Sequence, residues 1–235
     1  ICLSHQFFYI CNLQKFDMKN ILTIIVLITI TTISNGQITI NSSDLTNSGD
    51  QFVISTGTAF SGMDPALTGA NYVWDYSLLT SSSQTIDTIF DESSTGSLLS
   101  LYFIDNGFNP NRSNQCRHGN SFSAGQVNVS DVWDFFYNSS ASFAQPGYGA
   151  IVNGAPLPIA FTPKDIIYQF PLTYNSTNVS LSGYTLDLTT TLGIYYSVEK
   201  TRSNLVDGWG TVTTPYGTFD ALRVMSTIVE VDSFY

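Results

Sequence analysis

The segment GYTLDLTTTLGIYYSVEKT, residues 183–201, decides the fold class of this chain. Tyr184, Leu186 and Leu188 occupy every second position of its first half, and polar residues fill the positions between them. Its second half, from Ile194 to Val198, shows the same alternation. Successive side chains of a β-strand point to opposite faces, so a period of two predicts a strand with one buried face. The segment therefore predicts two strands.

Runs of the same kind recur along the chain, separated by clusters of Ser, Thr, Asn, Gly and Pro. They lie at 51–56, 72–77, 84–90, 132–137, 165–174 and 221–232. No helical period is sustained, and only Gly96–Ile104 is compatible with a short helix. We predict an all-β fold, an antiparallel sandwich or a strongly curved sheet, with at most one or two short helices. Long polar loops are expected at Asp105–Ser123 and Ala144–Pro158.

Residues 18–36 have the features of a secretory signal peptide. Lys19 supplies a positive charge, and the apolar run Ile21–Ile33 is shorter than the roughly 20 residues that a membrane-spanning helix needs. Ser34 and Gly36 place small side chains at the positions that signal peptidase prefers. These features predict export, to the outside of the cell or to its surface.

Cleavage after Gly36 would make Gln37 the first residue of the exported chain. We interpret residues 1–17 as translation upstream of the true start, because the signal features begin at Met18. Residues 37–235 are expected to form a single β domain without a membrane span. The sequence ends at Tyr235 inside a predicted strand, so we expect this domain to be truncated at its C-terminal side.

Charge and cysteine content exclude several classes of function. The exported chain would carry six Lys and Arg against seventeen Asp and Glu, a net charge of −11. So acidic a surface repels phosphate groups, which argues against nucleic acid as a partner. Cys116 would be its only cysteine, so neither an intrachain disulfide nor a thiolate metal cluster is expected.

The segment VDGWGTVTTPYGTFDALRV, residues 206–224, predicts a β-hairpin. Thr-Pro-Tyr-Gly at 214–217 has the residues of a tight turn, with Gly217 at positive φ. Phe219 is out of phase with the apolar residues that follow it, which predicts a β-bulge on its strand. Asp207 and Asp220 have no base or nucleophile beside them in the sequence and are expected on the surface.

This hairpin sequence, with LTGANYVWDYSLL at 67–79 and YQFPLTYN at 168–175, resembles β-rich modules of secreted proteins of Bacteroidetes-type bacteria. Many of those proteins are cargo of the type IX secretion system. The resemblance covers most of residues 37–235, and its motifs are structural rather than catalytic. It implies an N-terminal module followed by a C-terminal sorting domain, which this sequence does not include, in agreement with a truncated chain.

Candidates for catalysis are few. His118 follows Cys116 by two residues in a predicted polar loop, where we expect a free, solvated thiol rather than a catalytic pair. Carboxylate pairs that could serve a hydrolase are Asp131 with Asp134 and Asp91 with Glu92.

Metal and cofactor sites are not expected. The exported chain has too few His and Cys residues for zinc, and the Asp and Asn residues of 105–111 lack the acidic spacing of a calcium loop. We therefore predict that the protein needs no cofactor and that 105–111 is a polar turn.

The weak candidates for ligand binding are Trp133, Phe135 and Tyr137, which fall on one face of a predicted strand. A glycan or a peptide could stack on them, although core packing explains the same pattern.

Three functions remain open. We expect a non-catalytic β module of a larger extracellular or cell-surface protein, acting in adhesion or ligand binding. The first alternative is a carrier that holds a lipid-like ligand on the concave face of a curved sheet, lined by Tyr184, Leu186, Ile194, Tyr196 and Val198. The second alternative is a carboxylate-based hydrolase.

Overall fold

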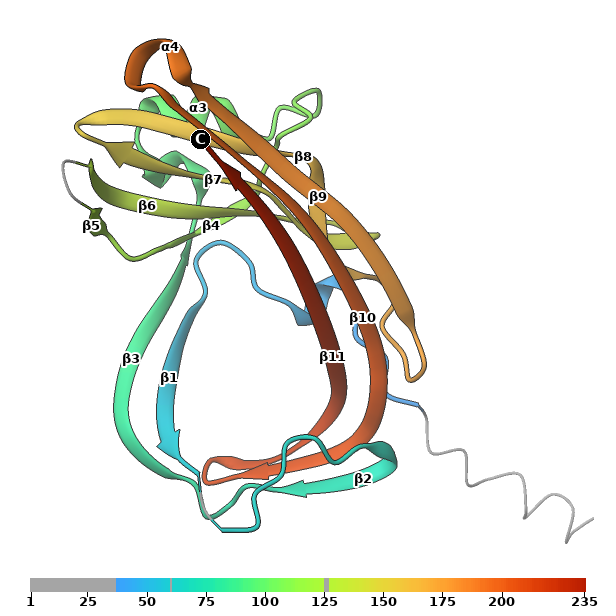
Figure 1. Ribbon diagram of the computed structural model, residues 1–235. Coiled ribbons are helices and arrows are strands. Elements are labelled where there is room, and N and C mark those ends of the chain that lie inside the picture. Colours follow the sequence, from blue (N-terminus) through green and yellow to red (C-terminus); the bar gives the residue numbers. More distant parts are fainter. Residues whose placement is uncertain (1–36, 60, 125–126) are drawn as a thin grey trace, which may run out of the picture. The chain divides into compact units, whose positions relative to one another are not determined.

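Figure 1 shows the computed structural model, which describes residues 37–59, 61–124 and 127–235. Residues from Gln37 to Tyr235 form one compact unit. The predicted upstream segment, the predicted signal peptide and Gly36 lie outside the described residues. No helix among the residues that are described is long and apolar enough to cross a membrane.

The first sheet contains seven strands and is antiparallel throughout. Its order is β1-β3-β4-β6-β7-β8, and β5 pairs with β6 beside this path. The strands are β1 (Gln51–Thr58), β3 (Thr80–Phe90), β4 (Gln115–His118), β5 (Phe122–Ala124), β6 (Val127–Asn138), β7 (Ser142–Val152) and β8 (Ala155–Gln169).

The second sheet contains four strands and is built around one long strand. They are β2 (Gly69–Asp75), β9 (Thr177–Leu188), β10 (Ile194–Thr214) and β11 (Gly217–Phe234). Strand β10 pairs with β11 along its whole length, with β9 over its first half and with β2 over its second half. The β2 pairing is parallel, so the predicted antiparallel arrangement holds for every strand pair except this one. Strands β10 and β11 bend strongly along their length (Figure 1).

Short helices complete the chain. They are the 3₁₀ turns η1 (Ser42–Asp44) and η2 (Glu92–Thr95), the helix α3 (Ser97–Phe103) and the single turn α4 (Thr189–Leu192). Helix α3 lies inside the segment predicted as helical. The all-β prediction is confirmed.

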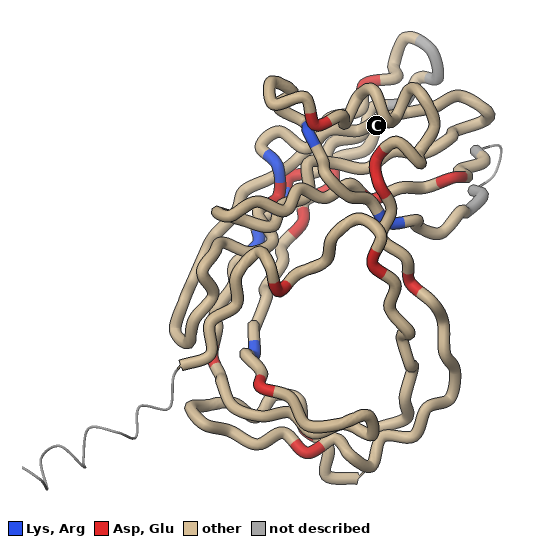
Figure 2. The backbone as a smooth tube through the Cα atoms, turned by 180° about the vertical axis from the view of Figure 1, so that it is seen from behind, with Lys and Arg blue, Asp and Glu red and all other residues tan. Residues whose placement is uncertain are grey.

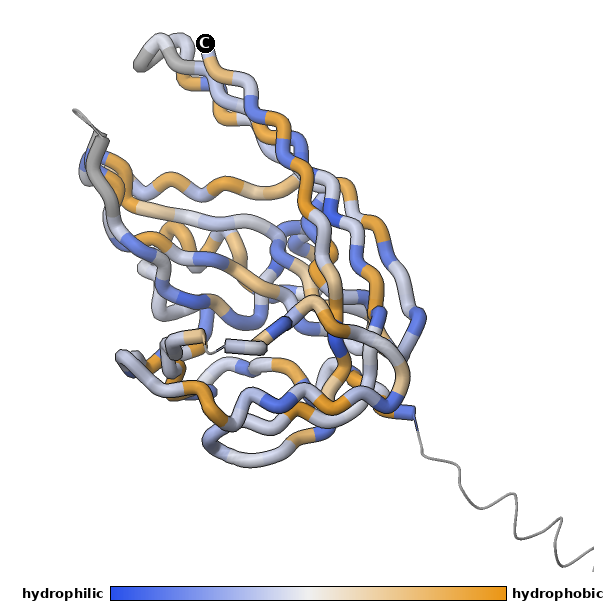
Figure 3. Tube along the Cα trace, turned by 60° about the horizontal axis from the view of Figure 1, so that its bottom comes forward, coloured by the Kyte–Doolittle hydropathy of each residue, from blue (hydrophilic) through white to orange (hydrophobic). Residues whose placement is uncertain are grey.

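The hydrophobic core lies where α3 packs on the first sheet. Its buried members come from α3, β4 and β6 and are Leu99, Phe103, Cys116, Trp133 and Phe135. The rings of Phe103 and Phe135 stack with centroids 3.9 Å apart. Away from this core, hydrophobic and hydrophilic residues alternate along several of the strands, as the colours in Figure 3 show.

The loop predicted at Ala144–Pro158 does not exist. Its residues form most of β7 and the start of β8, which are joined by a tight turn at Asn153 and Gly154. The small residues that suggested a loop let α3 approach the sheet, because a Cβ atom at Gly149 would lie 2.8 Å from the Leu99 side chain. Glycine is therefore needed there for packing rather than for a turn.

The loop predicted at Asp105–Ser123 is partly wrong. Its first half forms turns, but Gln115–His118 is β4, which pairs with β3 and β6. Cys116 is consequently fully buried in the core instead of solvated.

The hairpin predicted at 206–224 is confirmed, with two corrections. Thr214 pairs with Gly217 across a two-residue turn, and Gly217 has φ of 148°. The bulge lies at Asp207, between the pairs Val206–Val224 and Gly208–Arg223, and not on the strand of Phe219. Asp207 is also not a surface residue, since its side chain is 14% exposed and forms a salt bridge with Arg223.

Candidate functional site

The two sheets meet along β8, β9 and β10, where charged side chains are buried. Asp165 on β8 has no exposed side-chain surface and accepts two hydrogen bonds from the Arg202 guanidinium, from Nε at 3.0 Å and from NH2 at 2.8 Å. Lys200 Nζ lies 3.0 Å from the same carboxylate. Figure 2 shows red and blue segments side by side in this region of an otherwise sparsely charged backbone.

Ion pairing decides the protonation of Asp165. Burial by itself opposes ionisation, but the hydrogen bonds from Arg202 and Lys200 outweigh it, and the pKa of Asp165 lies below its ordinary value. The same contact with Asp165 raises the pKa of Arg202. Asp165 and Arg202 are therefore charged at neutral pH, and their contacts, with that of Lys200, clamp β8 to β10.

A pocket of about 260 Å³ opens beside this clamp, and we call it the aromatic pocket. Six strands, β6 to β11, contribute to its wall. The wall residues are Asp134, Gln145, Tyr148, Phe161, Ser182, Gly183, Tyr184, Tyr196, Val198, Lys200, Glu230 and Asp232.

Four rings in the pocket wall form a connected cluster. Tyr184 stacks on Phe161 at 5.6 Å and meets Tyr148 and Tyr196 edge to face at 5.5 and 5.9 Å. The Tyr148 hydroxyl donates a hydrogen bond of 2.8 Å to the Tyr184 hydroxyl. Burial raises the pKa of both tyrosines, and their mutual hydrogen bond raises that of Tyr184 further. Both phenols are thus neutral and can donate or accept hydrogen bonds, but neither is a ready base.

Asp134 is the most buried carboxylate of the pocket wall. Burial raises its pKa, while Arg117 and a 3.2 Å hydrogen bond from Gln145 act in the opposite direction. It can therefore gain stabilisation from any ligand that brings positive charge or hydrogen-bond donors.

Ser182 contributes an unpaired polar atom to the pocket wall. The residue is 6% exposed, and its Oγ is buried without a hydrogen-bond partner among the described residues. A buried hydroxyl left unpaired costs about 1–3 kcal/mol, so such groups are rare in folded proteins.

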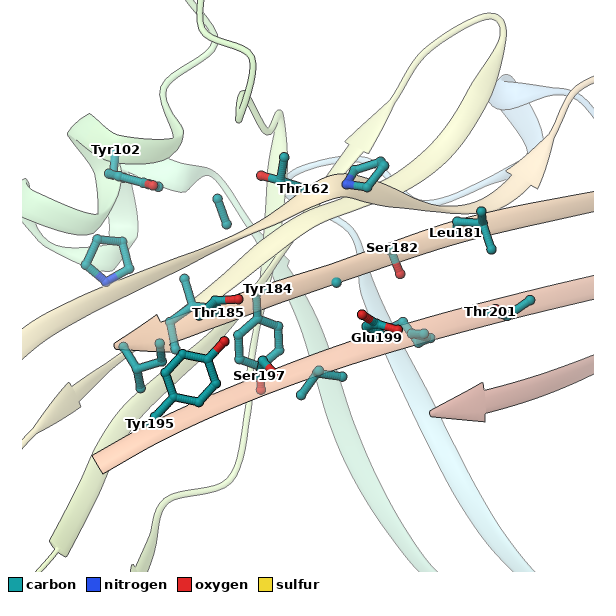
Figure 4. Close-up of a pocket in the computed structure, with 18 residues that line it drawn as sticks. Tyr102, Thr162, Leu181, Ser182, Tyr184, Thr185, Tyr195, Ser197, Glu199 and Thr201 are labelled. Carbon is teal, nitrogen blue, oxygen red and sulfur yellow. The ribbon is translucent and has the colours of Figure 1, made fainter. Parts of the chain in front are cut away.

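A larger groove of about 750 Å³ lies between β8 and the β9–β10 pair, and Figure 4 shows its wall. It shares Ser182, Tyr184 and Lys200 with the aromatic pocket, and adds residues such as Thr185 and Glu199. The wall is of mixed polarity and carries both hydroxyl and aliphatic side chains. The groove is suited to an extended, partly polar ligand.

The residues singled out for ligand binding lie elsewhere. Trp133 is 6% exposed and Phe135 is fully buried, and both belong to the hydrophobic core. Tyr137 is partly exposed, with the Arg112 guanidinium 4.8 Å and the Lys164 ammonium 5.5 Å from its ring centroid. The three residues therefore do not form a joint stacking surface.

Cys116 and His118 have separate hydrogen-bond partners. The Cys116 thiol donates to the backbone carbonyls of Phe90 and Asp91, and burial raises its pKa to about 12. His118 instead lies 3.2 Å from Asp131, whose carboxylate also accepts a hydrogen bond from Trp133. A thiol so far from ionisation at neutral pH is no nucleophile.

The carboxylates of the two predicted pairs have different surroundings. Glu92 is the first residue of η2, and burial together with the nearby charge of Asp91 raises its pKa. Asp131 serves His118 and Trp133, whereas Asp134 lines the aromatic pocket. Asp91 caps η2 by accepting a hydrogen bond from the Ser93 backbone.

The polar turn at 105–111 is held by its own side chains. Asn109 donates to the carbonyls of Tyr102 and Ile104, and Asp105 accepts from the Gly107 backbone. Within the described parts of the chain, no three His, Cys, Asp or Glu residues gather to hold a metal ion.

The aromatic pocket contains residues that sequence reasoning did not single out as a site. Tyr184 and Tyr196 were placed correctly on one face of two paired strands. Lys200 lies on the same strand face as Tyr196 and Val198. The sequence therefore already shows a cation on an apolar face, which could have indicated the pocket. Asp134, Phe161 and the β11 carboxylates could not be assigned to the pocket, because this depends on which strands become neighbours.

Comparisons with protein-family models, with curated protein sequences and with solved structures return no match for this chain.

Proposed function

We propose that this chain is a non-catalytic, ligand-binding β module of a secreted or cell-surface protein. The observation that carries the proposal is the unpartnered, buried Ser182 hydroxyl in a pocket walled by four aromatic rings and three carboxylates. Rings offer contact area, and polar groups on a rigid sheet fix the orientation of a ligand. The tyrosines and the Asp165 clamp supply rigidity rather than a nucleophile.

Export belongs to the same proposal. We place the signal peptide at 18–36, with cleavage between Gly36 and Gln37, on the sequence pattern alone. The resemblance to Bacteroidetes-type secreted modules suggests the type IX system as the route. Mass spectrometry of the N-terminus of the protein secreted by its host should find a chain that starts at Gln37.

The carrier alternative receives less support. Tyr184, Leu186, Tyr196 and Val198 do share a face, since Tyr184 pairs with Val198 and Leu186 with Tyr196. The aromatic pocket beside this face measures only about 260 Å³, and Asp134, Lys200 and Asp232 place charges around it. The larger groove that Tyr184, Leu186 and Val198 also line has a wall of mixed polarity, with Glu199 and Lys200 in it. A lipid tail would have to desolvate those charges, which is unfavourable.

A carboxylate-based hydrolase is a second candidate because of one observation. Asp134, whose burial raises its pKa, lines the same pocket as Glu230 and Asp232. An acid with a raised pKa near an ionised carboxylate is the usual pair of glycoside hydrolysis. Turnover of a glycoside panel by the protein, abolished in Asp134→Asn, would replace the binding proposal with this one.

Binding is tested by screening the protein against glycan, peptide and lipid arrays. Hits should be lost in Tyr184→Ala, which removes the centre of the ring cluster, and retained in Tyr216→Ala. Tyr216 is 67% exposed on the hairpin turn and serves as the matched control. Equal binding by both variants would place the ligand outside the aromatic pocket.

A further inference from the structure

The aromatic pocket retains negative charge after its internal ion pairs are formed. Lys200 is the only cation that the described residues contribute to its wall, and it lies 3.0 Å from Asp165 and 3.8 Å from Glu230. Asp134 and Asp232 also line the pocket, and neither has a salt-bridge partner among the residues that the structure describes. Arg117 and Lys200 attract Asp134 from a longer distance, but neither forms a salt bridge with it. Two carboxylates thus face the pocket without a cation in direct contact.

The rings around these carboxylates suit a cation. Lys200 Nζ already lies 4.9 Å from the centroid of Phe161, so the cluster accommodates an ammonium group at one of its rings. No cation lies over Tyr148, Tyr184 or Tyr196 in the described part of the chain. Their π-faces are negative and would attract a second positive group.

Ser182 indicates what kind of cation fits. Its buried Oγ has no partner and can accept a hydrogen bond from a ligand N–H. A primary ammonium has three N–H donors, enough for two carboxylates and one hydroxyl. A quaternary ammonium has none and would leave Ser182 unpaired.

Other ligand classes match the pocket less well. A metal ion lacks ligands, since no three His, Cys, Asp or Glu residues gather within the described ranges. An anion would be repelled by Asp134 and Asp232, and a neutral sugar would leave both charges uncompensated.

We propose that the aromatic pocket binds a primary ammonium group on an unbranched alkyl chain. The proposal rests on the ligand-binding function above and names its chemistry. A free alkylamine and a lysine side chain of a peptide present the same group, and a pocket of about 260 Å³ has room for either chain.

Calorimetric titration of the purified protein tests the proposal with matched probes. Pentylammonium should bind saturably and more weakly at high salt, because screening weakens charge attraction. Neutral 1-pentanol and quaternary choline should not bind measurably. If the natural ligand is a peptide, Gly-Lys-Gly should bind, and the same peptide with norleucine in place of lysine should not. If pentylammonium binds and Gly-Lys-Gly does not, the natural ligand is a free alkylamine.

Variants locate the site. Asp134→Asn and Asp232→Asn should each weaken pentylammonium binding about tenfold, the loss expected for one charge-assisted hydrogen bond. Ser182→Ala should weaken it about threefold, since it removes a hydrogen bond to a neutral group. Asp220→Asn, which removes an exposed carboxylate at the far end of β11, should leave the affinity unchanged. Asp232 lies on the exposed part of β11, so its variant remains informative even if Asp134→Asn does not fold.

The outcomes separate this inference from the proposed function. Equal binding of pentylammonium and pentanol, or full affinity in both Asp variants, would overturn the ammonium site. If an array ligand without an amine still needs Tyr184, the binding function stands and only its chemistry is wrong. If no probe and no array ligand depends on the pocket, both fail.

Discussion

The α3–β4–β6 core and the junction of the two sheets are both buried, but opposite kinds of interaction hold them. In the core, Phe103, Trp133 and Phe135 exclude water and need no polar partner beyond the Trp133 N–H bond to Asp131. At the junction, Asp165 is buried only because Arg202 and Lys200 neutralise it. Hydrophobic packing would have been the simpler solution there, because buried ion pairs contribute little net stability. The core is held mainly by apolar packing, whereas the junction places charged and hydroxyl groups beside the pocket in which we propose that a ligand binds.

The largest expected effect comes from the core. Phe135→Ala should lower the free energy of unfolding by about 3–5 kcal/mol, because it removes a fully buried ring and leaves a cavity. The loss should be equal at acidic and neutral pH, since the ring is uncharged. Urea unfolding followed by tryptophan fluorescence measures it, with Phe219→Ala as control, because Phe219 is 53% exposed. A similar loss in both variants would contradict the assignment of the core.

Breaking the junction should give a smaller loss that depends on pH. Asp165→Asn should destabilise the protein by about 3 kcal/mol at pH 7, because two buried cations lose their counter-charge. The pKa of Asp165 is lowered by folding, so its stabilisation is present above the unfolded pKa near 4 and disappears as the pH falls through the folded pKa. The deficit of the variant should therefore shrink in acid. A deficit that stays constant from neutral to acidic pH would mean that shape, and not charge, holds the junction.

The hairpin turn should be less sensitive than either buried region. Gly217→Val should cost about 1–2 kcal/mol, because a β-branched residue tolerates positive φ poorly and Gly217 has φ of 148°. Thermal melts beside Tyr216→Ala, which changes the same turn without that constraint, provide the comparison. Equal melting temperatures would show that the turn relaxes at no cost.

The smallest expected change in stability comes from the serines of β9, and it distinguishes a hydroxyl without a hydrogen-bond partner from one that has a partner. Ser182→Ala should leave stability unchanged or raise it by up to about 1 kcal/mol, because it removes a hydroxyl that has no partner. Ser180→Ala is the matched control, since Ser180 Oγ accepts a hydrogen bond from the Ile166 backbone and its loss should destabilise. Unfolding curves that rank the two variants in the reverse order would show that Ser182 is part of the scaffold.

Much of the fold can be predicted because its signals are local. The alternation at Tyr184, Leu186 and Leu188 reflects the geometry of one strand, and it holds whatever the neighbours are. Gly217 marks a turn for the same reason. Gly96–Ile104, the one run compatible with a short helix, contains the helix α3. The fold class, the β9 and β10 strands and the hairpin therefore follow from sequence alone.

Tertiary structure decided what depends on neighbours. The sequence predicts that Gly149 lies in a loop, but in the structure the Leu99 side chain of α3 fills the space that a Cβ atom at Gly149 would occupy. The sequence predicts that Cys116 is exposed, but it is buried because β4 lies between β3 and β6 in the sheet. The aromatic pocket is the extreme case, since Asp134 and Asp232 lie nearly one hundred residues apart and meet only because six strands converge. Which charges of the pocket have a counter-charge depends on which strands become neighbours. A short stretch of sequence does not contain that information.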